Sequence, residues 1–260
     1  MHLYISIVSH LHHSIIINLG TIKALASHPD ITVVCRDNIQ TKPLTVACKK
    51  YHVHYIANKQ KAGFAANNNA NFLYCKDTLG MKDDDYFVIL NPDIFMTNQA
   101  ITTLVSSLKA LKHDFYAPNL LLDNEQLMLD DNIRVYPKFI NFLETYLLNK
   151  RATMVNRKAG LLSTHSYWAS GAFLIIKAKL YQSAKGLDER YYLYCEDIDF
   201  CERLKIRGIH FHYLEHVKPT HHRRRDSKRF MTRYFWWHVF SVFRYSFSKK
   251  EFEARKSKIK

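Results

Sequence analysis

The first half of the chain alternates between short apolar runs and longer segments of helical pattern. Runs rich in Val, Ile, Leu and aromatic residues predict strands at 3–9, 31–35, 53–57 and 86–90. Helical patterns separate these runs, at 11–26, 63–76 and 98–112. This alternation is typical of a parallel, doubly wound α/β sheet, in which ligands bind beyond the carboxyl ends of the strands.

The second half follows a different rhythm. Extended segments are predicted at 115–122, 127–135, 170–176 and 209–214. Residues 139–149 predict a helix, and the weakly patterned stretch 150–166 a mobile loop. Because no repeat or low-complexity linker interrupts the chain, we expect one domain over 1–217 and a C-terminal appendage over 218–260.

An acidic cluster opens the strongest helical pattern of the second half. Glu196, Asp197 and Asp199 follow an aromatic run, and apolar residues then recur at helical spacing until Gly208, a candidate C-cap. Asp197 is therefore expected at or near a helix N-terminus. The cluster either caps that helix or supplies a general base, and the carboxylates alone favour neither interpretation.

Three polar residues end predicted strands and are expected to share one rim of the sheet: Ser9, Asp37 and Asp93. Asp93 follows Pro92, so it either forms a turn or ligates a metal. A departing nucleoside diphosphate needs a divalent cation or fixed cations to hold its charge, and a carboxylate, a histidine and diphosphate oxygens suit Mn²⁺ or Mg²⁺. His221, in a His-His-Arg-Arg-Arg run, is the candidate partner; that run is otherwise a solvated basic patch.

The segment Gly63-Phe64-Ala65-Ala66-Asn67 and the two asparagines after it open a predicted helix. Gly and Asn supply turn conformations and short polar groups at a helix N-terminus, where phosphate binds readily. In isolation this segment is equally compatible with a structural turn. No P-loop or GxGxxG is present, which weakens the kinase and dehydrogenase interpretations.

Composition describes an ordinary globular chain with an uneven charge. The 260 residues are 47% hydrophobic, without an apolar run long enough to span a membrane or an N-terminal signal-peptide pattern. Five cysteines without CxxC spacing fit a reducing cytoplasm and argue against a zinc site. Of the net charge of +15, +11 lies in residues 218–260.

These motifs, in this order, resemble the inverting GT-A glycosyltransferases of family 2, and within them bacterial rhamnosyltransferases that build O-antigen and related lipopolysaccharide chains. The matching stretches cover nearly the whole chain: 5–10, 33–38, 63–69, 83–94, 168–176, 186–208 and 216–245. The resemblance implies a Rossmann-like, mostly parallel central sheet with helices on both faces and a C-terminal basic helical appendage. It also implies transfer of a sugar, L-rhamnose from dTDP-rhamnose, to a glycan or lipid-linked acceptor.

The resemblance carries roles over to individual residues. It implies that Asp37 contacts the pyrimidine base of the donor, and that Ser9, Asn38, Gly63 and Asn67 lie around the donor. The metal, Mn²⁺ or Mg²⁺, and the diphosphate would be held by Asp93 and His221. On the acceptor side it implies Asp197 as general base beside Glu196, with Trp168 and Gly171 lining the site. A helix N-terminus acidifies a carboxylate, so the strength of this base must come from burial and neighbouring Glu196 and Asp199.

Three positions depart from the family pattern. Asn91 stands in place of the first Asp of the DXD-type motif, which leaves the metal fewer ligands from the protein. Tyr167 precedes Trp168 where relatives often have an acidic residue, and Lys185 replaces a common glycine.

Aromatic and basic residues interleave from Ser227 to Phe247. This pattern suits an interfacial helix on anionic lipid, which predicts a cytoplasmic enzyme held peripherally on the inner face of the plasma membrane. The aromatic residues could equally pack on the catalytic domain. Two rival functions remain: a nucleic-acid-binding module, from the high pI and the aromatic-basic pattern, and a sugar nucleotidyltransferase, which also uses a parallel sheet and a metal-binding Asp.

Overall fold

The computed structural model describes residues 1–123, 125, 128–157, 160–161, 166–223 and 233–260. Its strands are β1 (Leu3–Ser9), β2 (Ile31–Asp37), β3 (His54–Ala57), β4 (Tyr86–Leu90), β5 (Ile94–Phe95), β6 (Phe115–Pro118), β7 (Leu121–Asp123), β8 (Met128–Leu129), β9 (Ile133–Val135), β10 (Tyr167–Ala169), β11 (Phe173–Lys177), β12 (His212–Leu214) and β13 (Thr220–His221). Its helices are α1 (His13–Leu19), α2 (Thr21–Ala26), α3 (Lys42–Lys50), α4 (Phe64–Asp77), α5 (Asn98–Leu111), α6 (Phe139–Leu148), α7 (Ala178–Ser183), α8 (Glu196–Lys205) and α9 (Arg233–Phe247).

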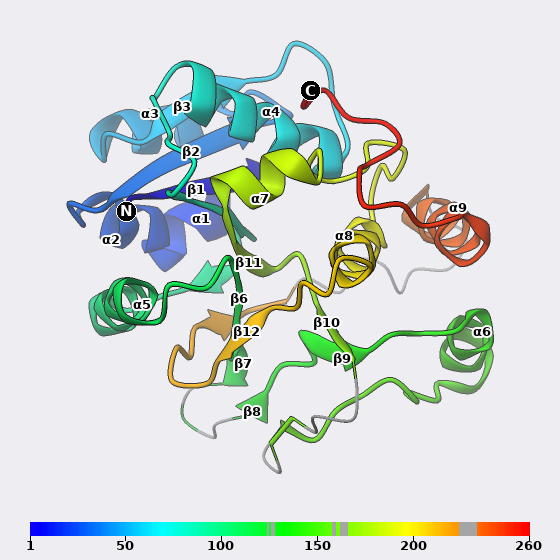
Figure 1. Ribbon diagram of the computed structural model, residues 1–260. Coiled ribbons are helices and arrows are strands. Elements are labelled where there is room, and N and C mark those ends of the chain that lie inside the picture. The colour runs from blue at the N-terminus through cyan, green and yellow to red at the C-terminus, as the bar shows by residue number, and fades with distance from the viewer. Residues whose placement is uncertain (124, 126–127, 158–159, 162–165, 224–232) are drawn as a thin grey trace.

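A seven-stranded sheet forms the centre, in the order β12-β6-β11-β4-β1-β2-β3 (Figure 1). β1 runs parallel to β2 and β4, whereas β11 runs antiparallel to both β4 and β6. The expectation of a mostly parallel α/β sheet is therefore confirmed. The fully apolar run of β4 is buried at all five positions, as a strand covered on both faces requires.

Helices cover both faces of this sheet, and two separate cores result. Alternate side chains of β1 point to opposite faces, so Leu3, Ile5 and Ile7 belong to one core while Tyr4 belongs to the other. The first core packs against α1, α2, α3 and α5, and the second against α4, α7 and α8.

Two small sheets extend from the carboxyl end of the central sheet. One pairs β9 with β10, and the other has the order β5-β13-β7-β8. β13 comes from the expected appendage, beginning two residues after the predicted boundary at 217/218. It pairs antiparallel with β5 and parallel with β7, so this part of the appendage lies beside Asp93.

Several predicted boundaries were wrong. The single helix expected over 11–26 is two helices, because Gly20 adopts a left-handed conformation (φ 67°) between them. Helix α8 ends at Lys205, three residues before the expected cap Gly208. Helices α3 and α7 were not predicted. Parts of the expected loop over 150–166, and residues 227–232 of the expected tail helix, lie outside the described residues.

The chain after α9, residues 248–260, forms a strap across α7 and α8, which we call the C-terminal strap. Ala254 donates its backbone N–H to the carbonyl of Ala184 at the end of α7. The Arg203 guanidinium of α8 donates to the carbonyl of Phe252 over 2.9 Å. Ile259 is buried in the second core, so the strap is part of the packed structure.

Candidate active site

The carboxyl ends of β1, β2 and β4 lie at one edge of the central sheet. Ser9 and Asp37 are register partners at the ends of β1 and β2. The β4–β5 turn carries Asp93, and Asn91 at its start donates its backbone N–H to the carbonyl of Ala172 over 2.8 Å. Three of the predicted site residues therefore share this edge. The Ser9 hydroxyl is buried and makes no hydrogen bond with any described residue.

The Asp37 carboxylate holds the loop that follows β2. Its Oδ1 accepts from the backbone N–H of Ile39 (3.0 Å), and its Oδ2 accepts from the backbone N–H and hydroxyl of Thr41 (2.8 and 2.7 Å) and from the Tyr55 hydroxyl (3.2 Å). Burial alone would raise the pKa of Asp37, but these hydrogen bonds outweigh it and hold the pKa below its ordinary value. The carboxylate is thus ionised and rigidly placed at neutral pH.

A second group of amides surrounds Asn38. Its Oδ1 accepts from the backbone N–H of Ala62 (3.1 Å) and from the side chains of Asn58 (2.7 Å) and Asn67 (3.3 Å). Asn38 and Asn67 are therefore brought together, as expected for two residues of one site. Asn58 was not predicted, because nothing in its flanking sequence marks it.

Most of the remaining asparagines of α4 are structural. Asn68 accepts from the buried Ser6 hydroxyl over 2.7 Å, and Asn69 binds the backbone of Leu187 through both its oxygen and its nitrogen. These amides satisfy polar groups between α4 and its neighbours. The Asn-rich pattern thus has one member at the candidate site, Asn67, and others in the core.

Gly63 allows the loop before α8 to approach the start of α4. A Cβ built on Gly63 would lie 2.4 Å from the carbonyl oxygen of Tyr192, closer than side chains tolerate. The same carbonyl accepts the backbone N–H of Phe64 over 2.8 Å. Phe64 in turn reaches Gly171, whose added Cβ would meet the Phe64 ring at 3.3 Å. The predicted donor and acceptor segments therefore touch.

His221 lies between two carboxylates. Its Nδ1 contacts Asp130 Oδ2 at 2.5 Å, and its Nε2 lies 3.4 Å from Asp93 Oδ1. A carboxylate only accepts, so Nδ1 carries a proton and Nε2 faces Asp93. Burial alone would lower the pKa of His221, but hydrogen bonds and attraction from Asp130 and Asp93 outweigh it and raise the pKa to about 9.

Asp130 is a buried partner of His221 that the sequence did not reveal. It is buried, and although burial would raise its pKa, the hydrogen bond to His221 and the charge of Arg223 lower it. Arg223 pairs with both Asp130 and Asp131. The sequence held only an indirect signal for this pairing. A buried His-Arg run needs acidic partners, and Asp130 and Asp131 are two adjacent acids in a segment predicted to be extended.

Asp197 lies in the first turn of α8, as predicted. Its Oδ2 accepts the backbone N–H of Gly171 over 2.9 Å, and its Oδ1 that of Ile198 over 2.9 Å. Burial raises the pKa of Asp197, and the two backbone donors oppose that shift without cancelling it. The expectation that burial would strengthen this base agrees with the direction of the shift.

The two acidic neighbours of Asp197 differ in their surroundings. Burial, and then the charge of Asp197, raise the pKa of Glu196 well above its ordinary value, and its Oε2 has no hydrogen-bond partner among the described residues. Asp199 instead pairs with Arg203 (2.8 Å) and Lys250 (3.2 Å). Its charge is thus balanced inside the protein.

Trp168 packs beside the base. It is buried on β10, donates its indole N–H to the carbonyl of Val135 over 3.1 Å, and lies under the Arg134 guanidinium at 5.8 Å. Arg134 also donates to Asp131 over 2.8 Å, and its charge acts on Asp197. This arrangement joins the acceptor-side residues to the acidic pair at 130–131.

A short backbone route connects Asp93 with Asp197. Asn91, two residues before Asp93, bonds to Ala172, and the adjacent Gly171 bonds to the Asp197 carboxylate. The backbone N–H of Ser170 also bonds to the carbonyl of Asn132, close to Asp130. The turn that carries Asp93 and the Asp197 carboxylate therefore both contact one segment, 170–172.

Asp93 and His221 fit a divalent cation that also binds the ligand. Two donors that each lie about 2.1 Å from one octahedral ion are roughly 3 Å apart, close to the 3.4 Å between Asp93 Oδ1 and His221 Nε2. Because a pKa of about 9 keeps His221 protonated at neutral pH, a cation would bind Nε2 by displacing its proton. The hydrogen bond from Nδ1 to Asp130 is the arrangement that orients metal-binding histidines. Over the described part of the chain, no group of three or more His, Cys, Asp or Glu could hold a metal. Further ligands would have to come from the bound substrate.

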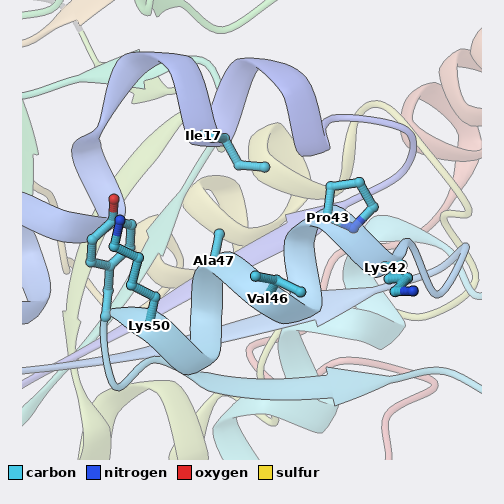
Figure 2. A pocket seen from close by; sticks show the side chains of 7 residues that line it. Ile17, Lys42, Pro43, Val46, Ala47 and Lys50 are labelled. Carbon is cyan, nitrogen blue, oxygen red and sulfur yellow. The ribbon is translucent and has the colours of Figure 1, made fainter.

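An apolar groove of about 420 Å³ lies elsewhere, between α1 and α3. Figure 2 shows Ile17 of α1 opposite Pro43, Val46 and Ala47 of α3. None of its lining residues belongs to the predicted site. The candidate active site is instead the polar edge at the ends of β1, β2 and β4.

Sequence comparison identifies a family. The model described as "Glycosyl transferase family 2" matches residues 16–171. The chain is 32% identical over 244 residues to the rhamnosyltransferase WbbL of Escherichia coli (strain K12), an alignment that covers 93% of this chain and 91% of WbbL.

Two solved structures share the fold at low identity. One is the mannosyltransferase PcManGT of Pyrobaculum calidifontis in complex with GDP-Man and Mn²⁺, with a TM-score of 0.53 and 12% identity over 93% of this chain and 62% of that one. The other is TarS 1–349 of S. aureus in complex with UDP, with a TM-score of 0.57 and 12% identity over 85% of this chain and 60% of that one. The chain thus spans about 60% of the length of these two structures.

Proposed function

Because this chain belongs to glycosyl transferase family 2 and is a glycosyltransferase with a GT-A fold, we propose that it moves L-rhamnose from dTDP-rhamnose to a lipid-linked or glycan acceptor during synthesis of O-antigen-type polysaccharide. The similarity to a rhamnosyltransferase over nearly the full length of both chains supports the sugar. The observation that carries the proposal is that segment 170–172 bonds both to the turn that carries Asp93 and to the Asp197 carboxylate.

The nucleotide of the donor binds beyond the ends of β1 and β2. Asp37 Oδ1 accepts a single hydrogen bond among the described residues, from Ile39, so it keeps a lone pair for an N–H of a pyrimidine base. The buried, unbonded Ser9 hydroxyl is available to the same ligand. The adjoining wall of the donor site is shaped by Asn38, Gly63 and Asn67. Their contacts fix the loop at 58–63 and the start of α4.

Asp93 and His221 are the residues that would hold Mn²⁺ or Mg²⁺ at the diphosphate end of the donor. The bound cation neutralises the negative charge that develops on the departing nucleoside diphosphate. Asp130 keeps Nε2 of His221 directed at Asp93, and Arg223 keeps Asp130 ionised. These residues therefore act on the leaving-group side of the sugar.

Asp197 acts on the opposite side as general base. The acceptor hydroxyl donates its proton to Asp197 while its oxygen attacks the anomeric carbon, and the bond to the diphosphate breaks on the far face. The configuration at that carbon inverts. The backbone N–H of Gly171 fixes the carboxylate, and Trp168 lines the acceptor side. Burial weakens the acidity of Asp197, and Glu196 is its buried acidic neighbour.

Because the proposed acceptor is linked to a lipid, we place the enzyme in the cytoplasm, attached peripherally to the inner face of the plasma membrane. Within the described residues, no helix combines the length and the apolar character needed to cross a bilayer. The basic, aromatic C-terminal segment supports a surface attachment. The rival assignments, a nucleic-acid-binding module and a nucleotidyltransferase, leave the family match without an explanation.

The test is a donor screen. Purified protein is incubated with dTDP-, UDP- and GDP-sugars and a soluble lipid-diphosphate GlcNAc analogue, with Mn²⁺, Mg²⁺ or EDTA, and release of nucleoside diphosphate is measured. We expect dTDP-rhamnose to be used best and EDTA to abolish turnover. Preference for another donor would refute the rhamnose assignment, and undiminished turnover in EDTA would refute the cation.

Substitution of the proposed base separates chemistry from binding. Asp197→Asn should lower kcat by about 10²–10⁴-fold, the usual contribution of a general base, with little change in the Kd for the donor. Glu202→Gln on the same helix is the matched control and should retain turnover. Asp93→Ala should instead weaken donor binding in the presence of Mn²⁺. Turnover by Asp197→Asn within tenfold of the unsubstituted enzyme would remove Asp197 as base.

A further inference from the structure

Helix α6 is apolar but not buried. Six of its ten residues are Phe, Ile or Leu, and none of its described side chains is buried. Leu147 and Leu148 are each 71% exposed, which is unusual for adjacent leucines of one helix. The helix lies at the edge of the molecule, away from the central sheet (Figure 1). Phe139 and Phe142 pack against the second core, but the core does not explain the four exposed apolar side chains of the helix.

Helix α9 extends this surface. It packs against α6 through Phe139, whose ring lies 5.4 Å from that of Phe243 and 5.2 Å from that of Phe247. Val242 and Tyr245 of α9 are buried in the second core, whereas other apolar side chains of the two helices are exposed. The exposed apolar side chains of the two helices define the α6–α9 face: Ile140, Leu143, Leu147, Leu148, Trp236, Phe240, Phe243 and Phe247. Ring contacts join Trp236 to Phe240 and Phe243 to Phe247, and exposed apolar side chains gathered on neighbouring helices are typical of an interaction site.

The charges around the α6–α9 face are almost all positive. Segments 138–151 and 233–250 contain seven Lys or Arg residues and one acid, Glu144, which Lys150 binds over 2.8 Å. Lys138, Arg151, Arg233 and Lys249 are exposed. A second copy of this chain would bring like charges together, whereas an anionic lipid surface complements them. Exposed Trp and Phe with flanking Lys and Arg are the side chains that interfacial helices use.

The α6–α9 face lies one loop away from the proposed base. Trp237 stacks on Tyr192 with ring centroids 4.4 Å apart, and the Ser241 hydroxyl donates to the carbonyl of Leu193 over 2.9 Å. Residues 192 and 193 precede Asp197 directly in the chain. These contacts therefore place the α6–α9 face next to the acceptor side of the candidate site.

We propose that the α6–α9 face docks the protein on an anionic bilayer, with the apolar side chains of both helices inserted among the headgroups and the basic rim on the lipid phosphates. The sequence pattern indicated only the tail helix; α6 supplies the other half of the surface. The docking proposal rests on the proposed function in one respect: a lipid-linked acceptor would explain why the α6–α9 face lies close to Asp197.

Flotation with liposomes tests the docking. Vesicles of phosphatidylethanolamine with about one-third phosphatidylglycerol are compared with phosphatidylcholine vesicles, each at low and at high salt. The full chain should float with the anionic vesicles and much less with the neutral ones. Leu147→Glu with Leu148→Glu should weaken binding at least about tenfold, because it removes two inserting side chains and adds two negative charges. Val46→Glu is the matched control, since Val46 is 59% exposed on α3, and should leave binding unchanged.

Other outcomes would overturn the proposal. Equal flotation of the α6 variant and the unsubstituted protein would show that α6 takes no part. A concentration-dependent dimer that the α6 substitutions dissociate, with no vesicle binding, would assign the face to a second copy. Turnover of the soluble acceptor analogue without lipid is measured in parallel. The α6 variant should keep that turnover, so failed docking and failed glycosyl transfer are distinguishable.

Discussion

Gly63→Ala is predicted to damage both stability and turnover through one steric contact. The new methyl group would lie 2.4 Å from the Tyr192 carbonyl oxygen and 2.8 Å from its Cα. Both neighbours are backbone atoms, so the two backbone segments at Gly63 and Tyr192 must move apart. A tolerable contact requires a separation of at least about 0.6 Å more. Gly63 has an ordinary φ of −69°, so this close approach, and not backbone conformation, requires the glycine.

The magnitude follows from two losses. Overpacking of this kind costs about 1–3 kcal/mol, and stretching the 2.8 Å hydrogen bond from Phe64 N–H to Tyr192 costs about 1 kcal/mol. Together they lower the free energy of unfolding by roughly 2–4 kcal/mol, or Tm by roughly 5–15 °C for a chain of this size. Because Tyr192 lies on the loop that leads into Asp197, we also expect kcat to fall by about tenfold to a hundredfold.

The assay pairs thermal unfolding with steady-state turnover well below Tm. Gly80→Ala is the control, because it introduces a side chain into open space at φ 74°, with strain but no clash. It should lower Tm modestly and leave kcat unchanged. A Gly63→Ala enzyme with an unchanged Tm and kcat would refute the reasoning, since the two loops would then have room to separate at no cost.

Two further predictions concern the buried acids of α8. Burial raises the pKa of Asp197, so a base that must be ionised should lose kcat/KM as the pH falls through a value above the ordinary 3.8; a profile that stays flat to pH 4, with folding verified by circular dichroism, would contradict this. Burial also raises the pKa of Glu196 well above the ordinary 4.5 that it has in the unfolded chain. Between the unfolded-state pKa and the higher folded-state pKa, the folded protein binds more protons, so its stability falls as the pH rises. Glu196→Gln should flatten that dependence in denaturant titrations between pH 5 and pH 8, and an unchanged slope would contradict the assignment.

Sequence patterns predicted the elements that bury apolar surface and missed those that depend on partners far along the chain. The run at 86–90 is apolar throughout because both faces of β4 are covered, and it was placed correctly. Pattern alone does not give strand direction, so the antiparallel insertion of β11 could not be foreseen. Helix α3 could have been found, since Pro43 near its start and Leu44, Ala47 and Cys48 at helical spacing are ordinary signals.

The candidate site shows the same division. Asp37, Asp93 and Asp197 are recognisable because each follows an apolar strand or opens a helix, where a carboxylate stands out in the sequence. Asp130 carries no such mark: its place beside His221 depends on β13 pairing between β5 and β7, a contact between residues 91 positions apart. The role of α6 is likewise a property of its packing, because an apolar helix looks the same in sequence whether it faces a core or solvent.

The C-terminal strap has a practical consequence for anyone handling this enzyme. Ile259 lies beside Gly186, the carbonyl of Lys256 accepts the backbone N–H of Glu189 before α8, and the carbonyl of Phe252 accepts from Arg203 of α8. A purification tag fused directly after Lys260, or a clone trimmed by ten residues, would therefore disturb the helix that presents Asp197, although it would alter no residue near the sugar. Affinity handles belong at the other terminus, where Met1 is 42% exposed and its amino group lies 3.9 Å from Asp85.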